Sequence, residues 1–322
     1  GLSMASETAN GPYDLAKLIK LATDNNLVLK ISSLEKRIAV EEYKESRALP
    51  NPEMEYAAGK FIAPNGEKPS IWGTGFKWSI PNPLERHFML KAGRADVKRA
   101  EIQQDIEHRE VIKELKHHYY KLRFFSKVKA FWQEKLDRLQ QVYKITKAKV
   151  EIGESKEIDA LRSSVEIQKT KTHLFQEEKH IIAEKTALNE FLNYTLPKDF
   201  NVADDYRFAP LPPLENDLKK LIDFSPKVRL TGAQLKRETA GLKAARYSII
   251  EGIELSGEYE KEPEGKKWKI GVGISIPLFN QKGATIRKAK LMKEKAALES
   301  DHVKKHFFAD LQRIMGDIRV LE

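Results

Sequence analysis

The sequence carries the same ten-residue pattern twice, almost 200 residues apart. WGTGFKWSIP runs from Trp72 to Pro81, and WKIGVGISIP runs from Trp268 to Pro277. Upstream of each copy, in a helix-forming segment, a Lys-Arg pair comes just after a leucine. This spacing is far longer than the roughly 20–50 residues of solenoid repeats. We therefore interpret the chain as a duplication of one domain-sized unit, with the order helix, two strands, helix.

The duplication divides the chain into consecutive segments. Residues 1–12 are small and polar and are expected to be a disordered lead-in, and 197–213 form a proline-rich linker. The first structural repeat covers 13–196, and the second, which is incomplete, covers 214–322. The expected elements are a helix over 13–49 that breaks near Asn25-Asn26, a hairpin over 53–81 with a turn at 63–66, long helices over 84–149 and 156–196, a helix ending near Ala245, a hairpin over 248–277 and a helix over 282–321.

The two repeated strands alternate large apolar residues with small or polar ones. This period, kept over about ten residues, is typical of a tilted strand that crosses a lipid bilayer with one face toward lipid and the other toward water. Lys77 and Lys269 are candidates for the water-filled side, where they would favour anionic solutes. The residues expected to face lipid are Trp72, Phe76, Trp78, Ile80, Trp268, Ile270, Val272, Ile274 and Ile276.

Four strands are too few to close a barrel, and open sheet edges are not tolerated in lipid. If the strands span a membrane, several chains must combine them, and three chains would supply twelve. The alternative is an amphipathic hairpin packed on a soluble core, because the partner strands contain Glu53, Glu55 and Glu251 and alternate less clearly. The sequence has no apolar run long enough for a transmembrane helix.

The two longest predicted helices each carry more than one apolar stripe. Leu115, Leu122 and Leu136 belong to a heptad series in the first helix, and Ile167 and Leu174 begin one in the second. One stripe per helix is explained by an ordinary antiparallel coiled coil. Two stripes indicate two neighbours for each helix, as in a bundle or a closed helical wall.

With this order of elements the chain resembles the TolC-type family of outer-membrane efflux proteins, the outer membrane factors of tripartite efflux systems. The likeness covers nearly the whole chain. It includes the duplicated unit, the run SIPLFNQKG at 275–283, and VEIGESKEIDALRSSVEI at 150–167, which resembles the family's periplasmic helix tip. LPNPEME at 49–55 is similar to the heavy-metal-efflux branch. The second repeat has no tip or returning helix, so the chain resembles a C-terminally truncated member.

The resemblance implies a fold and a function. The fold class would be mainly α with a small β part: long antiparallel coiled-coil helices forming an α-barrel wall, and two β-hairpins contributing four strands to a trimeric membrane β-barrel. The protein would be the outer-membrane channel of a tripartite efflux or secretion system, a passive conduit for export. Its partners would be outer-membrane lipid, a periplasmic adaptor protein and an inner-membrane pump. The residues implied at the adaptor-facing helix tip are Ile152, Gly153, Glu154 and Ser155.

Other functions find less support in the sequence. It has no cysteine, glycine-rich phosphate loop, metalloprotease motif or nucleophile elbow, so no enzyme, cofactor or metal site is expected. Glu114 and His118 lie one helical turn apart, but a solvated helix face explains them better than a metal site. The net charge of +10 leaves a soluble coiled-coil scaffold or a basic nucleic-acid-binding protein as the alternative. Interleaved charges and the lack of an aromatic-basic platform disfavour nucleic acid.

Overall fold

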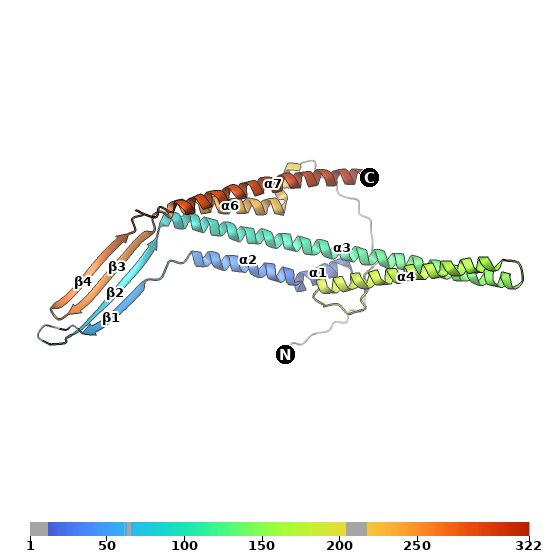
Figure 1. Ribbon diagram of the computed structural model, residues 1–322, viewed down its shortest axis with the longest axis horizontal. Coiled ribbons are helices and arrows are strands. Elements are labelled where there is room, and N and C mark those ends of the chain that lie inside the picture. The colour runs from blue at the N-terminus through green and yellow to red at the C-terminus, as the bar shows by residue number, and fades with distance from the viewer. Residues whose placement is uncertain (1–11, 61, 63–65, 204–217, 322) are drawn as a thin grey trace. The chain divides into compact units, whose positions relative to one another are not determined.

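The computed structural model describes residues 12–60, 62, 66–203 and 218–321. Helices dominate it, and four strands form its small β part, which confirms the predicted fold class of a mainly α chain with two β-hairpins (Figure 1). Three expectations fall wholly or mostly outside the described residues. They are the disordered lead-in, the first hairpin's turn and the linker beyond residue 203.

The elements follow the predicted order, and most of their ends lie within a few residues of the expected ones. The second hairpin is shorter than expected, because its first strand begins at Gly252 and its second ends at Ile274. The elements are α1 (Leu15–Asn25), α2 (Leu27–Ser46), β1 (Glu53–Lys60), β2 (Ser70–Pro81), α3 (Pro83–Glu151), α4 (Glu157–Phe191), α5 (Leu218–Phe224), α6 (Pro226–Tyr247), β3 (Gly252–Glu262), β4 (Gly265–Ile274) and α7 (Gly283–Leu321).

The chain forms two compact units. The first contains residues 1–31 and 107–212, and the second contains 32–106 and 213–322. Both boundaries that precede residue 150 fall inside a helix, α2 in one case and α3 in the other. The second unit therefore combines segments of both predicted repeats, whereas the first unit contains only the first repeat and its flanking segments. The repeats themselves stay a prediction.

The first unit packs helix on helix around an apolar core. Leu18 of α1, Leu115 and Leu122 of α3 and Leu188 of α4 lose essentially all their exposure to solvent there. After α4 the chain returns to α1, where Tyr13 forms a parallel bridge with Val202. This core lies where α1 and the returning segment pack against the α3–α4 pair.

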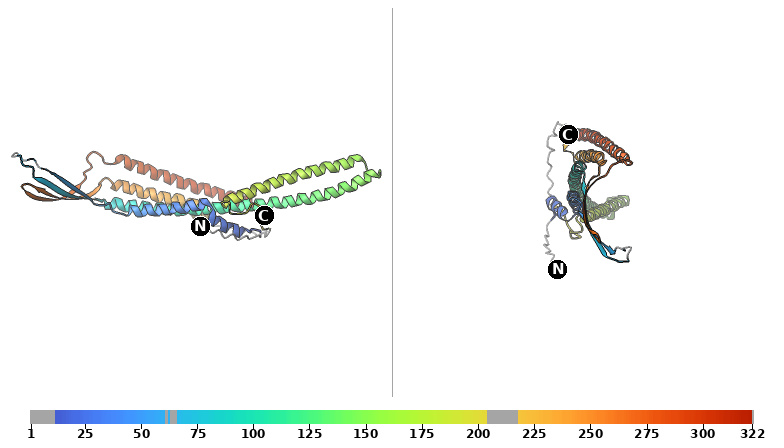
Figure 2. Two further views of the ribbon diagram at one scale, coloured as in Figure 1. Left: turned by 90° about the horizontal axis from the view of Figure 1, so that it is seen from below. Right: turned by 90° about the vertical axis from the view of Figure 1, so that its left-hand side faces the viewer.

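Farther along, α3 and α4 run antiparallel beside each other (Figure 2). Two ring stacks join them: Phe125 with His180, with centroids 4.6 Å apart, and Trp132 with His173, at 4.4 Å. Successive stacks are seven residues apart on both helices, which is the heptad spacing. The predicted heptad series therefore marks the seam of an antiparallel helical hairpin.

The helix expected over 13–49 breaks at Asn26, as predicted. The Asn26 side-chain oxygen accepts hydrogen bonds from the backbone N–H groups of Val28 and Leu29, at 2.9 and 3.3 Å, and so caps α2. Its amide nitrogen donates to the Phe191 carbonyl at the end of α4, at 2.8 Å. One buried asparagine thus starts a helix and joins it to a segment 165 residues away.

The second unit contains a four-stranded antiparallel sheet in the order β1-β2-β3-β4 (Figure 1). The two hairpins meet through β2 and β3, the inner strands, where Trp78 lies opposite Leu255. In the same unit α6 and α7 lie side by side (Figures 1 and 2). Pro226 occupies the first turn of α6, where its missing N–H costs nothing, and separates α6 from the short α5.

Candidate functional site

The strand register sorts the sheet into an apolar face and a charged face. Residues directly opposite each other in neighbouring strands point to the same side, and side chains alternate along each strand. Eight of the nine residues predicted to face lipid share one side, and the ninth, Ile276, follows the end of β4. The apolar face consists of Met54, Tyr56, Ala58, Trp72, Thr74, Phe76, Trp78, Ile80, Ile253, Leu255, Gly257, Tyr259, Trp268, Ile270, Val272 and Ile274.

Much of this apolar face is exposed. Ile270 keeps 79% of its surface accessible and Trp268 keeps 74%. Trp72 lies between Tyr56 and Tyr259, with ring centroids 6.4 and 5.5 Å away, so aromatic rings cross the sheet as a band. An exposed apolar surface of this kind marks contact with a partner or with lipid.

The opposite face holds both lysines that the sequence singled out. The Lys77 ammonium lies 3.2 Å from the Glu254 carboxylate, and that of Lys269 lies 3.4 Å from Glu258. Glu53 is directly opposite Lys77, on this same face. Glu53 and Glu55, which seemed to weaken the alternation of β1, therefore follow it. The lysines are paired with acids across the strands. These acids could not be identified from the sequence, because their positions depend on the strand register.

The strands meet the helices at a close-packed junction. The Asn82 side chain caps α3 by accepting from the Leu84 N–H, at 2.9 Å, and donates to the carbonyls of Tyr247 and Ile250, at 2.9 and 3.0 Å. Gly252 has φ of 126°, and a Cβ there would lie 2.2 Å from the Ile80 carbonyl oxygen. The turn from α6 into β3 therefore requires glycine at this position.

Two carboxylates at this junction have pKa values that are shifted in opposite directions. Burial raises the pKa of Glu85, and the nearby Glu251 carboxylate adds to that rise, while Lys282 opposes it. The hydrogen bond from Lys282, 3.2 Å away, lowers the pKa of Glu251. Lys282 thus favours the charged form of the exposed Glu251, whereas burial makes the charged form of Glu85 less favourable than in water.

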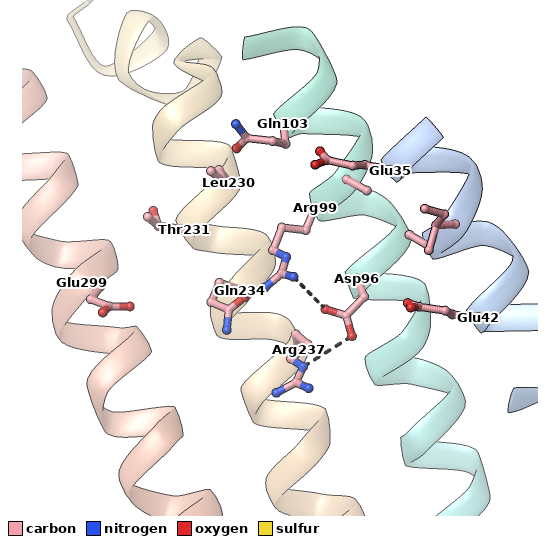
Figure 3. A pocket seen from close by; sticks show the side chains of 13 residues that line it. Glu35, Glu42, Asp96, Arg99, Gln103, Leu230, Thr231, Gln234, Arg237 and Glu299 are labelled. Atoms are coloured by element: carbon pink, nitrogen blue, oxygen red, sulfur yellow. Dashed lines mark hydrogen bonds and ion pairs between the residues drawn. The ribbon is translucent and has the colours of Figure 1, made fainter. Parts of the chain in front are cut away.

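The helices of the second unit line an open cavity of about 770 Å³, with several charged side chains in its wall (Figure 3). Asp96 of α3 lies between Arg99 and Arg237, at 3.8 and 3.4 Å. Arg237 also donates to the buried Glu238 at 2.8 Å, and Gln234 donates to the same carboxylate at 2.8 Å. Burial works to lower the pKa of Arg237, but its carboxylate partners raise it overall.

Each charge in this network has an opposite charge beside it, and the Asp96–Arg237 ion pair links α3 to α6. Within the described residues, no three His, Cys, Asp or Glu side chains form a metal-ligand set. His118, weighed above with Glu114, contacts Glu184 of α4 instead, with its Nδ1 2.7 Å from the carboxylate.

The predicted helix tip is a tight reversal between α3 and α4. Gly153 has φ of 78°, and the backbone N–H groups of Gly153 and Glu154 donate to the carbonyls of Val150 and Lys149, at 3.0 and 2.8 Å. This pair of bonds is a Schellman motif, in which a left-handed glycine ends the helix. Ile152 is 70% exposed there.

Among the described helices, none is both long and apolar enough to cross a bilayer.

No protein-family model matches the chain, and no curated protein matches it. Solved structures do resemble it. CusC, studied for folding and transmembrane channel formation, has a TM-score of 0.80 and 17% identity, over 95% of this chain and 76% of its own. The CmeC outer membrane channel of Campylobacter jejuni has a TM-score of 0.75 and 17% identity, over 92% and 68%.

The MtrE outer membrane channel of Neisseria gonorrhoeae, in its open state, has a TM-score of 0.77 and 19% identity, over 92% of this chain and 71% of its own. At these identities the likeness is one of fold. The chain has the fold of outer-membrane channels, with a mostly helical body and a small antiparallel sheet.

Proposed function

We propose that this chain is the outer-membrane channel component of a tripartite efflux or secretion system. The observation that carries the proposal is the sorting of the sheet. Four strands of 8 to 12 residues place apolar side chains on one face and every glutamate on the other. Strands of about this length, tilted, cross a bilayer with one face in lipid and the other in water.

Such a sheet needs further copies of itself, because the outer edges of β1 and β4 would leave unpaired backbone groups in lipid. In the proposal a homotrimer combines twelve strands in one β-barrel, with Lys77 and Lys269 facing its lumen. The helices extend it as a passive conduit through the periplasm. Phe131 of α3 and Phe175 of α4 belong to the additional apolar stripes of these helices, and they are 59% and 71% exposed. In the proposal, neighbouring copies of the chain cover them.

The tip residues Ile152, Gly153, Glu154 and Ser155 would meet a periplasmic adaptor, which joins the channel to an inner-membrane pump. The Schellman turn supports this role, because it holds Ile152 outward on a rigid reversal that a partner can recognise. LPNPEME at 49–55 favours the heavy-metal-efflux branch, as the sequence resemblance implies.

Neighbouring residues of β4 offer a matched test of the two faces. The chain has no cysteine, so Ile270→Cys and Lys269→Cys each introduce a single thiol. In vesicles containing the trimer, a water-soluble maleimide is expected to label Cys at 269 and to spare Cys at 270, and detergent is expected to expose both.

The same preparations should show a detergent-solubilised mass of three 36.9 kDa chains and conductance in planar bilayers. A monomer that does not associate with vesicles and labels equally at both positions would contradict the proposal.

A further inference from the structure

Three lysines interrupt the apolar face, and all three lie at the end of the sheet away from the helices. Lys60 ends β1, Lys261 lies one residue before the end of β3, and Lys266 is the second residue of β4. The register places them on the same side as Trp72 and Trp268. Elsewhere in the strands this side carries only apolar residues, hydroxyl residues and glycine.

These lysines are not balanced by acids on their own face. All glutamates within the four described strands lie on the other side, where Lys267 pairs with Glu262 and Lys269 with Glu258. Lys261 and Lys266 are moreover directly opposite each other in the β3–β4 ladder. Like charges in that arrangement destabilise a sheet. An anion from outside the sheet would remove this repulsion.

The aromatic band indicates the level of the three lysines along the strands. Lys60 is directly opposite Ser70, two residues beyond Trp72, and Lys261 is directly opposite Trp72 itself. Tyr259 and Trp268 are directly opposite each other, and Lys261 and Lys266 follow two residues farther along their strands. Two strand residues span about 7 Å. Tyr and Trp side chains sit at the headgroup level of a bilayer, and a lysine ammonium extends beyond its apolar stem. With the apolar face in lipid, the ammonium groups would lie at the level of the lipid phosphates.

We propose that Lys60, Lys261 and Lys266 bind the phosphate groups of anionic lipids in the leaflet that contacts this end of the sheet. The inference rests on the proposed function, because it requires the apolar face to lie in lipid. It adds that the sheet prefers an anionic leaflet on one side only, since the end near the helices carries no lysine on this face. Each lysine near an anionic surface contributes about a fivefold gain in binding.

The test compares two triple variants with the same loss of charge. K60Q/K261Q/K266Q removes the lysines of the apolar face, and K77Q/K267Q/K269Q removes three from the opposite face. Each protein is mixed with vesicles of phosphatidylcholine alone or with added phosphatidylglycerol, and the bound fraction is measured by flotation. Wild type and the opposite-face variant are expected to prefer anionic vesicles by on the order of 100-fold, and the apolar-face variant should lose most of that preference.

Three further readouts separate the explanations. K60R/K261R/K266R keeps the charge and should restore the preference, and phosphate buffer should compete no better than chloride of equal ionic strength. An apolar-face variant that keeps the preference, or phosphate that abolishes it selectively, overturns the inference. A wild-type chain that binds neither kind of vesicle, and whose tryptophans are not quenched by brominated acyl chains, contradicts the proposed function instead.

Discussion

The base of the α3–α4 hairpin buries its apolar side chains, whereas the four-stranded sheet leaves many of its own exposed to solvent. Leu115 and Leu188 are fully buried by their own chain, whereas Ile270 and Trp268 stay more than two-thirds exposed. The helical core is therefore completed within one chain. The strands of the sheet are hydrogen-bonded to one another, but no part of the described chain covers their apolar face, so its burial requires lipid or another protein chain. This difference predicts how each region responds to substitution.

The largest effect is expected from truncating the helical core. Leu115→Ala leaves a cavity among fully buried neighbours and should cost about 3–5 kcal/mol of unfolding free energy. Ile270→Ala should cost less than about 0.5 kcal/mol in the absence of lipid, because its side chain is already exposed. Urea unfolding in the absence of both lipid and detergent, followed by circular dichroism, checks both. Equal losses would mean that the sheet is buried by another part of the protein.

A substitution that restricts the backbone of the sheet should destabilise it more than the truncation of an exposed side chain. Gly252→Ala forces a Cβ against the Ile80 carbonyl at a positive φ, and should cost about 3 kcal/mol. Gly257→Ala, in the same strand, is the control, since its new Cβ would only touch the Lys269 carbonyl at 3.9 Å. Hydrogen exchange of the β2–β3 amides is the measurement. Comparable protection in both variants would show that the junction can relax.

A smaller loss of stability is expected in both regions, because in each a buried asparagine caps a helix and donates a hydrogen bond to a distant carbonyl. Asn26→Ala and Asn82→Ala remove a helix cap and a bond to a distant carbonyl, and each should cost about 1–2 kcal/mol. Exposed Asn51→Ala serves as the neutral control. The change in unfolding midpoint is the readout. If only one of the two substitutions matters, the caps do not play equivalent roles.

The smallest effect concerns Glu251 and Glu85 at the junction between the strands and the helices, whose pKa values are shifted in opposite directions. The lowered pKa of Glu251 means that its stabilisation is present above its unfolded pKa and is lost as pH falls through the folded value. The raised pKa of Glu85 has the opposite consequence, since its contribution is present at low pH and is lost as pH rises through the folded value. Carboxyl NMR titration checks the two directions. Shifts of the same sign would be inconsistent with Lys282 pairing mainly with Glu251.

Much of the local structure could be predicted from the sequence. Period-two alternation predicted β2 and β4, heptad spacing predicted the α3–α4 seam, and Gly153 marked the reversal between those helices. These signals are local, because side-chain periodicity and backbone freedom act within a few residues. Arg237 belongs to the second of the two repeated Lys-Arg pairs, but no sequence pattern indicated its partner Asp96, which is 141 residues away.

The sequence by itself determined which segments are helix and strand, and which side of β2 and β4 is apolar. Only the tertiary structure decided that β2 pairs with β3, and hence that Glu254 and Glu258 neutralise the lysines while Lys261 and Lys266 share the apolar face. The physical reason is register. A slip of one residue in a strand moves every side chain to the opposite face, and register between distant strands depends on packing and turns that no local pattern encodes.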